Sequence, residues 1–262
     1  MDVDLKILEV AVRAAKEAGR YALAHMGKLK EIEEKTSMND LVTDVDKHCE
    51  KTIIGIILKE FPEHSIIAEE SGKTINEEEY HWVIDPLDGT TNYAHTLPIF
   101  CTSIGVMRGP KVIAGAIYDP SRDELFTASD GKGAFLNGKR ISVSASTKVN
   151  SSLLVTGFAY DIDGRLLALP YFTEMLRHAR AVRRLGSAAL DLSYVASGRF
   201  DGFWEFGLNP WDMAAGQLLV KEAGGIVTDM EGEELNIFKK NIIASNSSIH
   251  SELLSLLSIK PL

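Results

Sequence analysis

Two aspartates that follow an apolar run are the residues best suited to chemistry in this sequence. The apolar residues 82–84 lead directly into Asp85, Pro86 stiffens the turn, and Asp88 follows close behind. Hard divalent cations such as Mg²⁺ prefer carboxylate oxygens that converge in this way. The segment therefore predicts a cation site, although an Asp-Gly pair is also typical of a plain turn.

The residues after Asp88 have the properties of an anion site. Gly89 allows a close approach of the backbone, and Thr90 and Thr91 offer hydroxyl groups and backbone N–H groups. A metal ion and a phosphate group could therefore meet at this turn.

Two more acidic residues lie at the ends of predicted elements. Glu69 follows the apolar segment 65–68, and Asp212 opens a predicted helix whose small residues 214–216 permit close packing. A solvated loop would explain Glu69, and capping would explain Asp212. Four carboxylates at element ends would nevertheless repel one another unless cations lay between them, so together they favour a metal site.

Three motifs together resemble the signatures of the inositol monophosphatase family: Glu69-Glu70-Ser71, the segment 85–93 (DPLDGTTNY) and the segment 211–216 (WDMAAG). The resemblance covers nearly the whole chain. It implies a mixed α+β and α/β chain folded as the layered α-β-α-β-α sandwich of the inositol monophosphatase and fructose-1,6-bisphosphatase type. It also implies hydrolysis of inositol 1-phosphate, dependent on two or three Mg²⁺ ions and sensitive to lithium, by a cytoplasmic homodimer.

The resemblance also assigns roles to residues at matching positions. The metal ligands would be Glu69, Asp85, Asp88, Asp212 and the backbone carbonyl of Leu87. Thr90 and Glu69 would orient the attacking water, and Asp46 would pair with Thr90. Without the resemblance, Asp46 would be interpreted as an exposed charge on a helix.

The same matching predicts the substrate contacts, which are Asp88, Gly89, Thr90, Ser187, Ala188, Glu205 and Asp212. Glu205 would accept hydrogen bonds from ring hydroxyls, while Ser187 would contact the substrate and also cap a helix. Asp191 is expected to be a charge on a helix surface. In this mechanism the cations lower the pKa of a bound water, so no covalent nucleophile is required. Cys49 and Cys101 are then interpreted as small buried apolar residues.

Other functions compete with this prediction. Fructose 1,6-bisphosphate and histidinol phosphate remain alternative substrates, whereas Thr91-Asn92 disfavours a 3′-phosphoadenosine 5′-phosphate phosphatase. A different class is a regulatory protein that binds the transcription machinery, as some bacterial relatives do, through the basic residues Arg180, Arg183 and Arg184. A solvated face or a dimer contact is the preferred explanation of these arginines, because charge clusters are often merely solvated.

Composition limits the remaining classes. The 262 residues carry 28 basic and 37 acidic side chains, a net charge of -9, which argues against a surface built to coat nucleic acid or an anionic membrane. The two cysteines form no metal-binding pair, and no signal peptide or membrane span is recognisable. The composition therefore favours a folded, soluble, cytoplasmic protein with a small-molecule phosphomonoester as its partner.

Hydrophobic periodicity predicts the elements that must position these residues. Helices are expected over 5–26, 42–61, 166–178, 187–197, 211–223 and a last segment ending at 257. Strands are expected over 65–68, 80–84, 100–107, 112–118, 124–128, 134–136, 141–143, 153–155, 182–185, 200–206, 226–228 and 241–245. Near residue 145 the predicted pattern changes from successive strands to alternating strands and helices. This change divides the chain into an α+β half, 1–145, with the main metal motifs, and an α/β half, 146–262, with Asp212 and the substrate loop.

Overall fold

The computed structural model describes residues 3–29, 32–34, 41–76 and 79–258. Two long helices open the chain, α1 (Val3–His25) and α2 (Asp44–Glu60), and both bury an apolar stripe against each other and the first sheet. Thr43 caps the start of α2, and Pro62 stands just beyond its end because proline cannot continue a helix. Both predicted helices are thus confirmed.

The first sheet has eight strands. In spatial order they are β10 (Lys139–Arg140), β9 (Gly133–Leu136), β8 (Glu124–Ser129), β7 (Lys111–Asp119), β6 (Cys101–Arg108), β5 (Tyr80–Asp88), β3 (Ser65–Ala68) and β4 (Gly72–Thr74). Neighbouring strands run antiparallel apart from β3 and β5, which run parallel. The predicted, mostly antiparallel sheet is therefore confirmed.

The second sheet has five strands. In spatial order they are β12 (Ala181–Arg183), β11 (Leu153–Thr156), β13 (Gly202–Phe206), β15 (Asn241–Asn246) and β14 (Gly225–Thr228). β11 runs parallel to both of its neighbours, and the other pairs are antiparallel. The helices of this half are α4 (Ile162–His178), α5 (Ala188–Ala196), α6 (Pro210–Glu222) and α7 (His250–Leu257).

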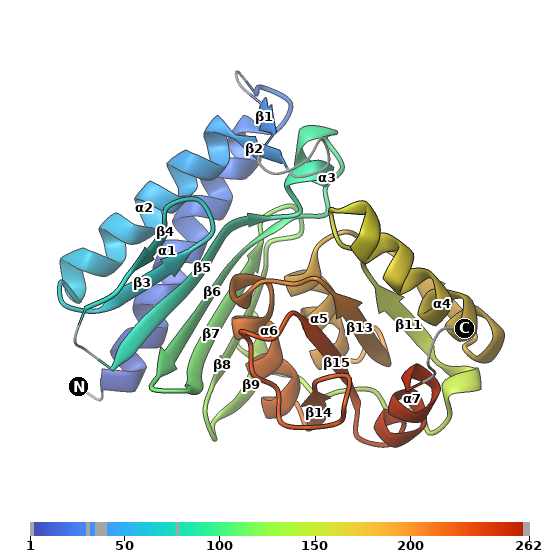
Figure 1. The fold of residues 1–262 in the computed structure, drawn as a ribbon. Coiled ribbons are helices and arrows are strands. Elements are labelled where there is room, and N and C mark those ends of the chain that lie inside the picture. The colour runs from blue at the N-terminus through green and yellow to red at the C-terminus, as the bar shows by residue number, and fades with distance from the viewer. Residues whose placement is uncertain (1–2, 30–31, 35–40, 77–78, 259–262) are drawn as a thin grey trace.

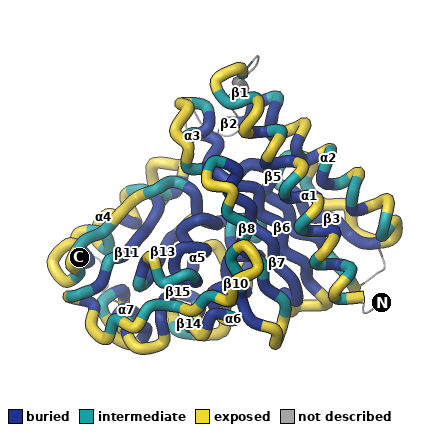
Figure 2. Tube along the Cα trace, turned by 180° about the vertical axis from the view of Figure 1, so that it is seen from behind, coloured by how far each residue is buried: buried dark blue, intermediate teal, exposed yellow. Residues whose placement is uncertain are grey.

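The elements form five layers, which Figure 1 shows from one side to the other. Helices α1 and α2 cover the outer face of the first sheet, α5 and α6 lie between the two sheets, and α4 and α7 cover the second sheet. Figure 2 shows the buried chain concentrated in the sheets and in the helices between them. The expected α-β-α-β-α sandwich is confirmed.

Close packing brings α6 onto the first sheet. A Cβ atom at Gly105 would lie 2.6 Å from the Cβ of Ala214, and one at Gly115 would lie 3.0 Å from the carbonyl oxygen of Ala215. Glycines on β6 and β7 therefore let the small residues of α6 approach the strands directly. The predicted role of the small helix face is confirmed.

The structure corrects the second strand of the predicted hairpin. Asn137 and Gly138 have the positive φ angles that the turn requires, 49° and 74°. The returning strand, however, is β10, not residues 141–143; Ile141 still donates its N–H to the Ala134 carbonyl of β9, whereas Val143 donates to the carbonyl of Ala223 at the end of α6. Competition from a distant segment thus ends the hairpin early.

Several short elements escaped prediction. These are β1 (Ile32–Glu34), β2 (Leu41–Thr43), β4, α3 (Thr90–Ala94) and the 3₁₀ turn Val149–Ser151. Three to five residues are too few to show a hydrophobic period. The division of the chain into two domains near residue 145 stays a prediction.

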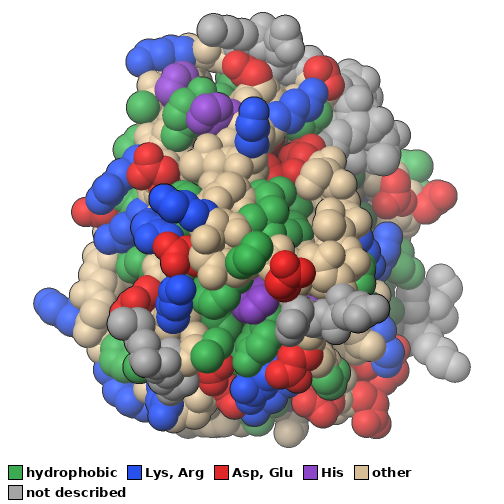
Figure 3. All heavy atoms as spheres, turned by 90° about the vertical axis from the view of Figure 1, so that its left-hand side faces the viewer, with side chains coloured by type: hydrophobic (Ala, Val, Ile, Leu, Met, Phe, Trp, Pro, Cys, Tyr) green, Lys and Arg blue, Asp and Glu red, His purple; other side chains and the backbone are tan. Residues whose placement is uncertain are grey.

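Two properties of the surface complete the fold. Within the described residues, no helix is long and apolar enough to cross a bilayer. On the face that carries α2, acidic and basic side chains are mixed, as Figure 3 shows, so this face presents no broad basic surface.

Candidate active site

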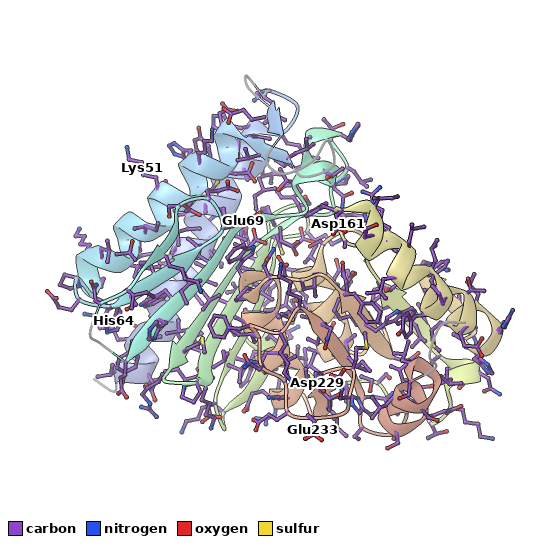
Figure 4. All side chains as sticks on the ribbon, in the orientation of Figure 1. Lys51, His64, Glu69, Asp161, Asp229 and Glu233 are labelled. Carbon is purple, nitrogen blue, oxygen red and sulfur yellow. The ribbon has the colours of Figure 1, made fainter. Side chains whose placement is uncertain are left out.

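Parallel pairing of β3 and β5 brings the first two carboxylates together. Ala68 pairs with Ile84, so the next residues along the two strands, Glu69 just after β3 and Asp85 within β5, lie side by side. The Glu69 N–H donates to the Ile84 carbonyl over 3.2 Å. Figure 4 shows Glu69 at the end of β3 that faces the second half of the molecule.

An irregularity in β5 places Asp88 with Asp85. The partner residues on β6 are Cys101 for Asp88 and Ser103 for Asp85, so three steps along β5 match two steps along β6. Side chains alternate between the faces of a regular strand, and an odd separation would put the two carboxylates on opposite faces. The extra residue of this bulge returns both to one side.

Helix α6 supplies the fourth carboxylate from the second half of the chain. Asp212 stands in the first turn, where its Oδ2 accepts the Asn209 N–H over 2.7 Å. The close contact of α6 with β6 and β7 holds this turn against the end of β5. Glu69, Asp85, Asp88 and Asp212 therefore line one cavity, together with Leu87, Gly89, Thr90, Ser187, Ala188 and Glu205.

Burial and mutual repulsion raise the pKa values of the carboxyl groups of Asp85 and Asp212. Burial raises the pKa of Asp85 well above its usual range, and the charges of Glu69, Asp88 and Asp212 raise it further. Burial and then Asp88 raise the pKa of Asp212 in the same way. Asp85 and Glu69 also hydrogen-bond to each other. The ionised forms of Asp85 and Asp212 are therefore disfavoured unless a cation offsets their charge.

The donor set fits a hard divalent cation, because it consists of oxygens whose repulsion a cation would relieve. Among the described residues, however, no three His, Cys, Asp or Glu side chains are already grouped to hold an ion. One oxygen of Asp88 accepts a backbone N–H group, and so does one oxygen of Asp212. Asp85 forms a side-chain hydrogen bond with Glu69. Cation binding would therefore replace the bond between Glu69 and Asp85.

Asp46 and Thr90 form the predicted pair. Thr90 Oγ1 lies 3.1 Å from Asp46 Oδ1 and 3.0 Å from the carbonyl oxygen of Leu87. The other Asp46 oxygen accepts the Thr43 N–H over 2.9 Å in the capping box of α2. Asp46 is completely buried, which contradicts the alternative of an exposed helix charge, and burial raises its pKa to about 6.

Gly89 and Ser187 line the cavity from the first and the second half of the chain, respectively. Gly89 has a φ of 94°, and a Cβ there would lie 2.8 Å from the carbonyl oxygen of Ile99, so only glycine fits. Ser187 precedes α5, but its side chain makes no capping bond and instead donates to Asp88 Oδ2 over 2.6 Å. Ser187 stands at the N-cap of α5 as expected, but its side chain accepts no capping bond, because Asp88 Oδ2 accepts the Ala189 N–H in its place.

Glu205 and Arg184 line the part of the cavity contributed by the second half of the chain, and Asp191 on α5 is close enough for the Glu205 charge to affect its pKa. Glu205 on β13 is buried, which raises its pKa to about 8, while the Arg184 charge lowers it. Arg184 lines the cavity and, like Arg180 and Arg183, is exposed. Asp191 is 1% exposed, and neither of its carboxylate oxygens has a hydrogen-bond partner among the described residues. The expectation that Asp191 lies on a helix surface is wrong.

Sequence reasoning missed the segment that closes the cavity above Glu205. Gly157, Phe158, Ala159 and Tyr160 line it, and a Cβ at Gly157 would lie 2.2 Å from Glu205 Oε1. Nothing local marks these residues, because their types are those of an ordinary loop after a strand.

Comparison with known proteins gives consistent results. Residues 4–261 match the model of the inositol monophosphatase family. The chain is 45% identical to the inositol-1-monophosphatase of Synechocystis over 97% of its length and 89% of the relative. It is 44% identical to the Nus factor SuhB of Escherichia coli K12, over 95% and 94% of the two chains. The crystal structure of the extragenic suppressor protein suhB from Bartonella henselae superposes with a TM-score of 0.93, at 41% identity, over 98% and 100%.

Proposed function

Because this chain belongs to the inositol monophosphatase family, we propose that it is a Mg²⁺-dependent phosphomonoesterase that hydrolyses inositol 1-phosphate in the cytoplasm. The observation that carries the proposal is the convergence of Glu69, Asp85, Asp88 and Asp212 on one cavity beside the pair of Asp46 and Thr90. Two buried carboxylates, Asp85 and Asp88, and two half-buried ones, Glu69 and Asp212, that repel one another would destabilise the fold without a compensating cation.

The carboxylates and the Leu87 carbonyl would hold two or three Mg²⁺ ions. When bound, the cations would neutralise the phosphate and lower the pKa of a water molecule. Thr90 has one hydroxyl proton, so when Asp46 accepts it the lone pairs of Thr90 Oγ1 are left to accept a hydrogen bond from that water. Thr90 and Glu69 would in this way orient the nucleophile.

The rest of the cavity would hold the substrate. Backbone N–H groups of Gly89 and Thr90 would bind phosphate oxygens. Glu205 would meet the ring hydroxyls, while Ser187 keeps Asp88 in place and, with Ala188, borders the same space. A hydroxyl-rich ring suits these donors and acceptors.

The test is phosphate release from inositol 1-phosphate with and without Mg²⁺. We expect activity that requires Mg²⁺, is inhibited by Li⁺ and falls at least about 100-fold in D212N. Fructose 1,6-bisphosphate and histidinol phosphate are assayed beside it to rank the alternative substrates. Failure to hydrolyse any phosphomonoester with any divalent ion would reject the proposal.

Resemblance to the Nus factor SuhB favours a second candidate function, binding to the transcription machinery. Arg180 and Arg183 are exposed at and beside the edge strand β12, where a partner could reach them. Capture of RNA polymerase or its elongation factors by the chain is expected to survive D212N and to be lost in R180A/R183A. The opposite pattern would reject this function.

A second copy of the chain is a further proposed partner. The outer face of α4 exposes large apolar residues spaced at helical intervals: Ile162, Leu166, Leu169 and Leu176. Several exposed large apolar residues on one helix are more typical of an interface than of a solvated helix.

A further inference from the structure

Glu50 is a buried acid that the proposed mechanism does not use. It lies on α2, four residues after Asp46, and is only 3% exposed. Its two carboxylate oxygens accept the N–H groups of Glu70 and Ser71, each over 2.8 Å. Residues four apart stand on one face of a helix, so Asp46 and Glu50 both point from α2 toward the site.

The two hydrogen bonds hold the turn that carries Glu69. Ala68 and Gly72 pair across the β3–β4 hairpin, which leaves Glu69, Glu70 and Ser71 as its loop. The Glu69 N–H is already bound to the Ile84 carbonyl. Three successive N–H groups are thus fixed, one by β5 and two by Glu50, and the backbone on both sides of Glu69 is held.

A surface hairpin does not need such an arrangement. Its N–H groups can bond to water, whereas burying a carboxylate costs several kcal/mol unless strong donors satisfy it. The buried Glu50 carboxylate therefore fixes the position of the turn 69–71 more firmly than water would. In metal sites, groups that orient a ligand in this way affect metal affinity nearly as strongly as the ligands do.

We propose that Glu50 is a positioning residue that aims Glu69 at the cation site. The inference rests on the proposed function, since it takes Glu69 to be a metal ligand. Together with Asp46, which holds Thr90, it makes α2 the element that orients both groups predicted to direct the attacking water.

E50Q tests this inference by calorimetric titration with Mg²⁺. The amide keeps the size of the side chain but presents an NH₂ group where an acceptor is required, so the turn loses one of its two bonds. We expect the Kd for Mg²⁺ to rise roughly tenfold or more. E50D, which keeps the charge but shortens the reach, is expected to fall between E50Q and the wild type.

D229N is the matched control. Asp229 is also fully buried, and its Oδ1 accepts the N–H groups of Glu231 and Glu233 while its Oδ2 accepts from Lys239, but it lies in a loop outside the cavity. Figure 4 shows it far from Glu69. D229N is expected to lower the melting temperature while leaving the Kd for Mg²⁺ unchanged, whereas E50Q changes both.

The outcomes separate this inference from the proposed function. An unchanged Kd in E50Q, or an equal change in D229N, would overturn the role of Glu50 and leave the phosphatase proposal intact. A wild-type chain that binds Mg²⁺ but hydrolyses no phosphomonoester would overturn the function alone. A wild-type chain that binds no Mg²⁺ would overturn both.

Discussion

Asp46 serves both the helix that carries it and, through Thr90, the cavity. One oxygen completes the capping box with Thr43, and the other reaches Thr90. The cap alone would explain an acid at this position. The burial of the whole side chain means that removing it would disturb the start of α2 as well as Thr90, so activity and stability would change together.

Glu205 gives a prediction at the residue scale that needs no substrate. Burial raises its pKa to about 8, so the ionised form is disfavoured in the folded protein. Its contribution to stability is therefore complete below the usual glutamate pKa and is lost as the pH rises toward 8. In metal-free protein, E205Q is expected to reduce the fall in melting temperature between pH 5.5 and 9 by on the order of 5 °C.

Thermal melts at several pH values check this expectation. E63Q, which changes an exposed glutamate, should keep the wild-type profile. The explanation fails if E205Q and the wild type lose stability in parallel over this range.

At the scale of elements, the position of Asp212 depends on how closely α6 approaches the sheet. Gly105 and Gly115 leave no space for a Cβ, so the helix rests on the strands themselves. Any side chain at these glycines must push α6 outward and take its first turn away from β5.

G105A tests this dependence. The new Cβ would lie 2.6 Å from Ala214, and we expect a loss of about 1–3 kcal/mol in the free energy of unfolding together with weaker Mg²⁺-dependent phosphate release. G55A is the control, because Gly55 lies on α2 and a Cβ added there would have nothing within 4 Å. It should stabilise the chain by about 0.5–1 kcal/mol. A G105A variant with full stability and activity would contradict this account.

At the scale of the whole molecule, the apolar face of α4 predicts self-association. Leu166 and Leu176 are each 56% exposed on the same helix. The double variant L166E/L176E would place two charges in each half of a dimer interface. We therefore expect the variant to be a monomer, with a mass by light scattering that is half that of the wild-type dimer.

Leu5 provides the control for this experiment. It is 54% exposed on α1, away from α4, and L5E should leave the mass unchanged. A wild-type chain that is monomeric at micromolar concentration would remove the second copy from the proposed partners.

Most of the helices and strands, and the four candidate carboxylates, could be predicted from the amino-acid sequence. Helical periods, caps and turn residues act between near neighbours, so they can be recognised without a fold. The motifs also pointed to the family, because they are local runs of residues.

Tertiary structure alone decided which side chains share the cavity. The bulge between Asp85 and Asp88 depends on strand register. The hydrogen bonds of Ser187 to Asp88 and of Glu50 to the turn after β3 join segments that are distant in sequence. The burial of Asp191 depends on how the layers pack. Nothing local distinguishes a buried carboxylate from an exposed one on the same helix. That difference is set only when the layers pack and water leaves the space between them.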